Sequence, residues 1–154
     1  MDKITRLQKS AMRIMTFSEF LAHSDPLYKK LEILKFCDSL AVNNCSFVYD
    51  FFHQKLPNSF TDTFFRAEEL YQYSTRQATS GQLYIPHYKT TTFGLKCIYK
   101  RCIDSWNRFS AEINSINRLN NRNHKEIKDI DLLNFSRSVL KDKLTKHVLC
   151  SYSE

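Results

Sequence analysis

Hydrophobic residues recur at helical spacing from the first turn of the chain onward. In residues 3–17 the apolar positions fall every three or four residues, which is the period of an amphipathic helix. These positions are Ile4, Leu7, Ala11, Ile14 and Met15. Arg6, Lys9 and Arg13 form a basic row on another face of the same helix. This row is either a solvated face or a ridge that contacts phosphates.

The next segment predicts a helix that begins near Pro26, because Ser24 or Asp25 can cap it and proline suits the first helical position. A longer helix is expected from Lys35 to Leu56, with the wide apolar face of a central core helix. Its stripe is formed by Leu34, Cys37, Ala41, Cys45, Val48 and Phe52. Pro57 ends this helix, since proline has no N–H and disfavours helical geometry before it.

Three more helices are expected in the rest of the chain. Ser59 or Thr61 can cap a short helix that reaches about Leu70. A long helix over residues 95–116 places one face toward a core, and a last helix spans residues 127–150, after an asparagine-rich polar loop. The face of the long helix holds Ile98, Cys102, Trp106, Phe109, Ile113 and Ile116, and that of the last helix holds Ile130, Leu133, Leu140, Leu144 and Val148.

The segment between these helices has a different pattern. Tyr71, Tyr73 and Thr75 alternate as a strand does, Ser80-Gly81 indicates a turn, and residues 83–85 are a second short strand candidate. Both glycines of the chain lie at or near this segment. The predicted fold is therefore mainly α: a single domain over residues 1–154 of five or six helices, with an irregular or short two-stranded segment near 71–92.

Composition adds limits to this picture. A chain of 154 residues with 42% hydrophobic and 14% aromatic content is typical of one globular domain rather than a disordered chain. No apolar run is long enough for a transmembrane helix, the first residues lack a signal-peptide core, and no membrane partner is expected. Five cysteines without a CxxC pair indicate reduced thiols, and hence an intracellular protein, cytoplasmic or nuclear.

Charge favours a polyanionic partner. The net charge is +7, and residues 95–154 hold twelve Lys/Arg against seven Asp/Glu. RNA or DNA is the expected partner, since Arg, Lys and Thr side chains are typical phosphate contacts. The nucleic-acid-binding candidates are Arg6, Lys9, Arg13, Thr75, Arg76, Lys89, Thr90, Lys96, Lys100 and Arg101. For Arg76 the alternative is bonding of loop carbonyls, and for Trp106 it is core packing rather than base stacking.

Catalytic patterns are missing from the sequence. No P-loop, dinucleotide fingerprint, nucleophile elbow or HExxH is found, and no acidic cluster suits two-metal catalysis. Cys97 and Cys102 are a poor zinc pattern. No catalytic residue, metal or cofactor is therefore predicted.

Several short motifs together resemble a known family. LQKSAMRIMTFSEF, DPLYKKLEILKF, YQYSTR, LYIPHYKTTTFG and WNRF occur in this order. In order and spacing they resemble the carboxy-terminal region of reverse transcriptases from non-long-terminal-repeat (LINE-type, jockey-like) retrotransposons, over about residues 4–149. Tyr71 stands where the family has histidine. Cys97, Arg101 and Ser110 replace a usual serine, glycine and proline.

The resemblance implies a region downstream of the polymerase thumb. The family's Tyr/Phe-Ala-Asp-Asp motif is missing here, so the chain is not expected to be an enzyme, although the parent family is an RNA-directed DNA polymerase. The leading hypothesis is a non-catalytic module that contacts RNA or DNA backbone. The alternatives are a helical protein-interaction module or structural cap that packs on the parent's upstream reverse transcriptase domain, and a non-functional remnant of the element. An exposed apolar patch on the helix at 3–17 would favour the protein-interaction alternative.

Overall fold

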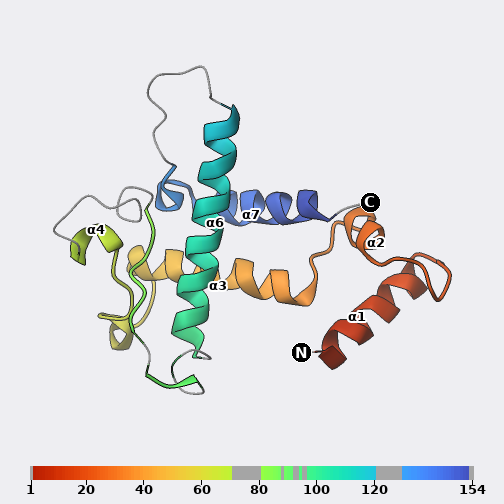
Figure 1. Cartoon of the computed structure of the whole chain (residues 1–154), viewed down its shortest axis with the longest axis horizontal. Helices are drawn as coiled ribbons and strands as arrows, with labels where there is room; N and C mark the ends of the chain where they lie inside the picture. Colours follow the sequence, from red (N-terminus) through yellow and green to blue (C-terminus); the bar gives the residue numbers. More distant parts are fainter. Residues whose placement is uncertain are drawn as a thin grey trace. The chain divides into compact units, whose positions relative to one another are not determined.

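The protein is mainly helical, as the sequence predicts (Figure 1). The structure is a computed structural model that describes residues 2–70, 81–87, 89–91, 94, 97–120 and 130–152. Its α-helices are α1 (Asp2–Met15), α2 (Asp25–Lys30), α3 (Phe36–Phe52), α4 (Ala67–Leu70), α6 (Ile98–Asn120) and α7 (Arg137–Ser151). Two short 3-10 helices, η1 (Asn58–Phe60) and η3 (Leu132–Asn134), join them.

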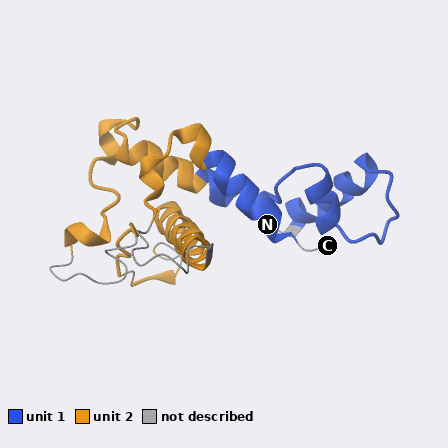
Figure 2. Ribbon diagram, turned by 90° about the horizontal axis from the view of Figure 1, so that it is seen from above, with its two compact units in different colours: residues 1–43, 141–154 blue, residues 44–140 orange. Residues whose placement is uncertain are grey.

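Contacts divide the chain into two compact units (Figure 2). Unit 1 combines residues 1–43 with residues 141–154, and unit 2 is residues 44–140. Both α3 and α7 contribute residues to each unit. The single domain expected from chain length stays a prediction.

Unit 1 is closed by Tyr152, the last aromatic residue of the sequence. The Tyr152 hydroxyl donates to Asp38 Oδ2 at 2.7 Å and accepts from the backbone N–H of Lys35 at 2.9 Å. Its ring makes an edge contact with Tyr28, with 6.2 Å between centroids, and the Lys35 ammonium lies 4.3 Å from its centre. Because Tyr152 is buried, these contacts tie the end of the chain to the start of α3.

Unit 2 is built around the middle of α6. Trp106 and Phe109 are fully buried there, and Ile103 lies on the same face. Phenylalanines from α3 and the segment after it add edge contacts, such as Phe51 to Phe64 with 5.2 Å between ring centroids. The core interpretation of Trp106 is therefore confirmed, because a ring with no exposed surface has no face for base stacking.

Two asparagines of α6 hold neighbouring loops by their backbones. Asn107 accepts from the Leu83 N–H at 2.7 Å and donates to the Leu83 carbonyl at 2.9 Å. One heptad later, Asn114 accepts from the Ile130 N–H at 2.6 Å and donates to the Ile130 carbonyl at 3.4 Å. A side-chain amide can pair with both polar groups of one residue, as a neighbouring strand would. These loops therefore need no β-sheet to satisfy their backbone.

The segment predicted near 71–92 is described in part. Leu83 forms an isolated antiparallel bridge with Arg66, so the strand candidate at 83–85 pairs with the residues before α4. The turn glycine Gly81 has φ of 67° and accepts a hydrogen bond from Trp106 Nε1 at 3.2 Å. The other strand candidate, Tyr71 to Thr75, lies outside the described residues, as does Ser80.

Some predicted helix bounds were wrong. The helix expected to reach Leu56 ends at Phe52, because Gln54 has φ of 55° and turns the chain. The helix expected from Ser59 to Leu70 is divided into η1 and α4. The last helix begins at Arg137, since the Asp131 side chain accepts from Leu133 N–H and caps η3 instead.

Candidate interaction surface on helix α1

The apolar stripe predicted on the first helix faces solvent. Leu7 and Ile14 are each 71% exposed, and Ile4, Ala11 and Met15 are exposed as well. The buried side of α1 holds Met12 instead. An amphipathic helix usually covers its apolar face against the core. Here the fold leaves that face uncovered.

Polar contacts explain which face of α1 is turned inward. The Gln8 side chain donates to the Leu34 carbonyl and accepts from the Phe36 N–H, both at 2.9 Å. Arg13 Nε donates to the Ala22 carbonyl at 2.9 Å. These bonds satisfy backbone groups of the chain that follows, which would otherwise lack partners. They therefore fix the rotation of α1 about its axis.

The residues after α1 extend the exposed apolar surface. Phe17 is 98% exposed and has φ of 52°, and Phe20 and Leu21 are also largely exposed. The sequence analysis placed Phe17 at the end of the helix at residues 3–17 and did not single out Phe20 or Leu21. The available signal was three large apolar residues within five positions, at i, i+3 and i+4, in a segment that forms no helix.

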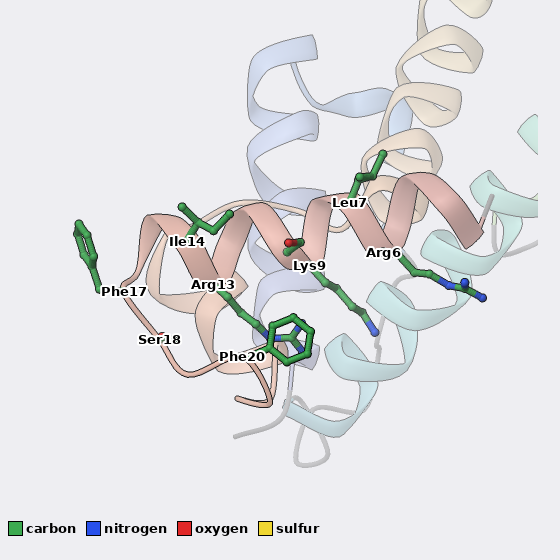
Figure 3. A pocket seen from close by; sticks show the side chains of 9 residues that line it. Arg6, Leu7, Lys9, Arg13, Ile14, Phe17, Ser18 and Phe20 are labelled. Carbon is green, nitrogen blue, oxygen red and sulfur yellow. The ribbon is translucent and has the colours of Figure 1, made fainter.

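The basic row of α1 borders an open hollow of about 810 Å³ (Figure 3). In Figure 3 Arg6, Lys9 and Arg13 extend to one side of the helix, while Leu7 and Ile14 lie on the other. Among the described residues, no carboxylate forms an ion pair with Arg6 or Lys9. One helix thus carries cationic and apolar surface side by side.

The other predicted binding residues belong to unit 2 or lie outside the described residues. Lys89, Thr90 and Arg101 are exposed in unit 2, and Lys100 forms an ion pair with Asp104. The remaining candidates, Thr75, Arg76 and Lys96, lie outside the described residues. Arg6, Lys9 and Arg13 are therefore the candidates that the described structure brings together within unit 1.

Charges beneath α1 are paired. Lys35 Nζ lies 2.9 Å from Asp25 Oδ2. This hydrogen-bonded ammonium lowers the pKa of Asp25, although partial burial acts in the opposite direction. Burial raises the pKa of Tyr152, and the hydrogen bond that its hydroxyl donates to the Asp38 carboxylate adds to this effect. Near neutral pH the Asp25 carboxylate therefore stays ionised and the Tyr152 hydroxyl stays protonated, as in an ordinary structural ion pair and hydrogen bond.

The described residues were compared with the needs of a metal site and of a reactive thiol. They contain no group of three or more His, Cys, Asp or Glu side chains that could hold a metal ion. All five thiols are free, and burial raises the pKa of Cys102 to about 11 and that of Cys45 further. The buried thiols of Cys45 and Cys102 are therefore poor nucleophiles. In the same part of the chain, no helix is long and apolar enough to cross a bilayer.

Comparisons with known proteins add no relative. No family model, curated protein or solved structure matches the chain. The exposed face of α1 is therefore interpreted from its own geometry and charge.

Proposed function

We propose that this protein is a non-catalytic module that contacts the backbone of RNA or DNA through α1. The observation that carries the proposal is the basic row: Arg6 and Lys9 have no ion-pair partner among the described residues, and they line an open hollow. Unpaired cations along one ridge can replace the counterions of a phosphate chain. The exposed rings of Phe17 and Phe20 are suited to stacking on unpaired bases, which favours a single strand.

The resemblance to the carboxy-terminal region of LINE-type reverse transcriptases supports the same proposal. In that setting the module would hold template RNA or target DNA next to a polymerase that another part of the parent protein provides. The net charge of +7 agrees with a polyanionic partner.

The test is a titration with single-stranded RNA and DNA at two or more salt concentrations. Each phosphate contact on a single strand contributes about 0.7 to the slope of log affinity against log salt. The double variant Arg6→Gln/Lys9→Gln should therefore reduce the slope by about 1.4. Arg13 is left intact, because its bond to Ala22 holds the loop after α1.

A charge-matched control is available on α7. Lys141 and Lys146 are exposed, and Lys141→Gln/Lys146→Gln removes the same net charge. This control should leave most of the slope in place. No binding at low salt, a salt-independent signal, or equal losses in the two double variants would contradict the proposal.

A second function has its own support in the exposed apolar stripe of α1. Five apolar residues of one helix and the three after it form an uncovered patch of the kind that marks protein interfaces. This patch favours a protein-interaction module, with the upstream reverse transcriptase domain as the partner that the resemblance suggests. Replacing Leu7 by Ser, which adds no charge to the helix, should weaken such docking and leave the salt slope for nucleic acid unchanged.

A further inference from the structure

One serine stands between two arginines of the basic row on α1. Arg6, Ser10 and Arg13 follow one another at intervals of four and three residues, which places them on one face of the helix. Ser10 is exposed, and it lines the same open hollow as both arginines. Its hydroxyl group therefore belongs to the surface that is proposed to bind nucleic acid.

We propose that Ser10 is a phosphorylation site, and that a phosphate on its hydroxyl prevents α1 from binding nucleic acid. The inference rests on the proposed function, because it names a regulation of that same surface. The arginines then bind a phosphate that the chain itself carries, in place of a phosphate of the nucleic acid.

Exposure distinguishes Ser10 from the other hydroxyl groups of this region. Thr5, Thr16 and Ser18 are half-buried. Thr16 Oγ1 donates to the Met12 carbonyl at 2.8 Å and shares a hydrogen bond of 2.8 Å with the Ser18 hydroxyl. A phosphate on Thr16 or Ser18 would break this arrangement, whereas a phosphate on Ser10 extends into the hollow.

The helix around Ser10 has few contacts that resist local opening. A protein kinase binds its substrate as an extended segment, so the turns next to Ser10 have to unwind for the reaction. Of the side chains at residues 3–15, Met12 alone is buried. Because segments with few buried apolar contacts open at little cost in free energy, α1 can present Ser10 to a kinase.

The modification is a phosphoryl transfer from a nucleoside triphosphate that the kinase binds. The bond between Ser10 Oγ and the γ-phosphorus forms, and the bond from that phosphorus to the β,γ-bridging oxygen breaks. The hydroxyl proton passes to the catalytic base of the kinase, and a nucleoside diphosphate leaves.

The added charge opposes the basic row. A serine phosphate carries about −1.5 to −2 near pH 7, so it offsets up to two of the three cations Arg6, Lys9 and Arg13. Guanidinium groups bind phosphate through paired hydrogen bonds. Arg13 Nε already donates to the Ala22 carbonyl, and the terminal nitrogens of the same group are further donors. The phosphate on Ser10 thus competes for the groups that a nucleic-acid phosphate would contact.

Titration with single-stranded RNA tests the effect on binding. The full chain is produced with Ser10→phosphoserine installed during translation. Loss of two phosphate contacts should lower the slope of log affinity against log salt by up to about 1.4, and should weaken binding roughly 25-fold at about 0.1 M salt. Ser138→phosphoserine is the matched control, because Ser138 is exposed on α7 and the added charge is the same. This control should keep most of the slope.

Phosphorus-31 NMR tests the contact with the arginines in the absence of nucleic acid. Nearby cations favour the dianion, so the second pKa of the phosphate on Ser10 should lie below its ordinary value of about 6. Arg6→Gln should raise this pKa, whereas Lys141→Gln, at an exposed position of α7, should leave it unchanged. Far-ultraviolet circular dichroism should show that α1 stays helical, since charge pairs at these spacings support a helix.

A kinase reaction tests access to the hydroxyl. The unmodified full chain is incubated with magnesium ATP and a serine kinase that prefers basic residues around its substrate serine. Mass spectrometry should find the phosphate on Ser10 ahead of Thr16 and Ser18.

Several results would overturn the proposal. These are an unchanged salt slope with phosphate on Ser10, an equal reduction with phosphate on Ser138, an unshifted phosphate pKa, a loss of helix, and modification of Thr16 or Ser18 in place of Ser10. A wild-type chain that binds no RNA would contradict the proposed function instead. The NMR titration would then still show whether the arginines hold the phosphate, so the two failures are distinguishable.

Discussion

At the scale of single residues, the fold depends on side chains that replace missing secondary structure. Asn107 and Asn114 each pair with both backbone groups of one loop residue. The Gln8 side chain of α1 likewise donates to the Leu34 carbonyl and accepts from the Phe36 N–H. Sequence reasoning did not identify these roles, because an amide that bonds a distant backbone leaves no periodic pattern. In the sequence, Trp106 and Asn107 stood out only as part of the WNRF motif that carries the resemblance to reverse transcriptases.

Removing the Asn107 amide should destabilise unit 2. Asn107→Ala leaves the N–H and carbonyl of Leu83 without their partners, and Leu83 is buried. An unsatisfied buried group costs about 1–3 kcal/mol, so the two groups together should lower the free energy of unfolding by roughly 2–6 kcal/mol. Urea unfolding followed by Trp106 fluorescence measures it. Asn43→Ala, an exposed position on α3, should change little, and equal effects would contradict the assigned role.

The Asp25–Lys35 pair gives unit 1 a pH dependence of known sign. Because the folded-state pKa of Asp25 is lowered, its stabilisation is fully present above the ordinary value of 3.8 and is lost as pH falls through the folded value. Asp25→Asn should therefore be less stable than wild type near neutral pH, by up to about 1 kcal/mol, since the pair is partly exposed.

The test of this pair is a set of denaturant titrations between neutral pH and pH of about 3. The difference between wild type and Asp25→Asn should shrink toward zero as the carboxyl takes up its proton. Asp62→Asn, at an exposed carboxylate, should show no such difference. A difference that stays constant or grows on acidification would show that the pair does not stabilise the folded state.

At the scale of elements, three helices end in the same unusual way. Phe17, Glu32 and Gln54 follow α1, α2 and α3 with φ between 52° and 55°. The Gln54 N–H bonds to the Phe51 carbonyl and the Lys55 N–H to the Asp50 carbonyl, which is the Schellman pattern. Glycine usually occupies this left-handed position because other residues are strained there. Sequence rules that look for glycine or proline consequently placed the end of α3 too late.

Replacing Gln54 by glycine should stabilise the protein. The side chain of Gln54 is exposed, and the left-handed conformation costs a non-glycine residue roughly 1 kcal/mol, so Gln54→Gly should raise the free energy of unfolding by up to that amount. Gln54→Ala keeps the strained backbone and should bring no gain. Thermal unfolding of the two variants separates these outcomes, and equal stabilities would show that the strain is absent.

The periodicity of α1 predicted the helix correctly but could not show which face the fold would cover. Helical spacing identifies an apolar stripe, and in most proteins that stripe packs on the core. In this chain Gln8 and Arg13 determine the buried side, where Met12 lies, through hydrogen bonds to backbone groups that follow α1 in the sequence. The exposure of Leu7 and Ile14 is thus a tertiary property, and it made α1 the candidate site.

At the scale of the whole molecule, the helical fold class and its main helices could be predicted from the sequence, because long apolar periods dominate residues 36–52 and 98–120. Assembly of the binding candidates could not be predicted. The spacing of charged residues in the sequence does not show which cations form ion pairs. In the structure Lys100 pairs with Asp104, whereas Arg6 and Lys9 have no ion-pair partner among the described residues. The basic excess of residues 95–154 pointed to the other end of the chain, yet the row that borders a hollow is on α1.

The central claim is that α1 is the surface through which the protein binds its nucleic-acid partner. Lysine footprinting by reductive methylation, with and without saturating single-stranded RNA at low salt, tests it most directly. The account predicts that RNA protects Lys9 and leaves the exposed Lys89 and Lys146 modified at unchanged rates. Unchanged modification of Lys9, or stronger protection of Lys89 or Lys146, would contradict it.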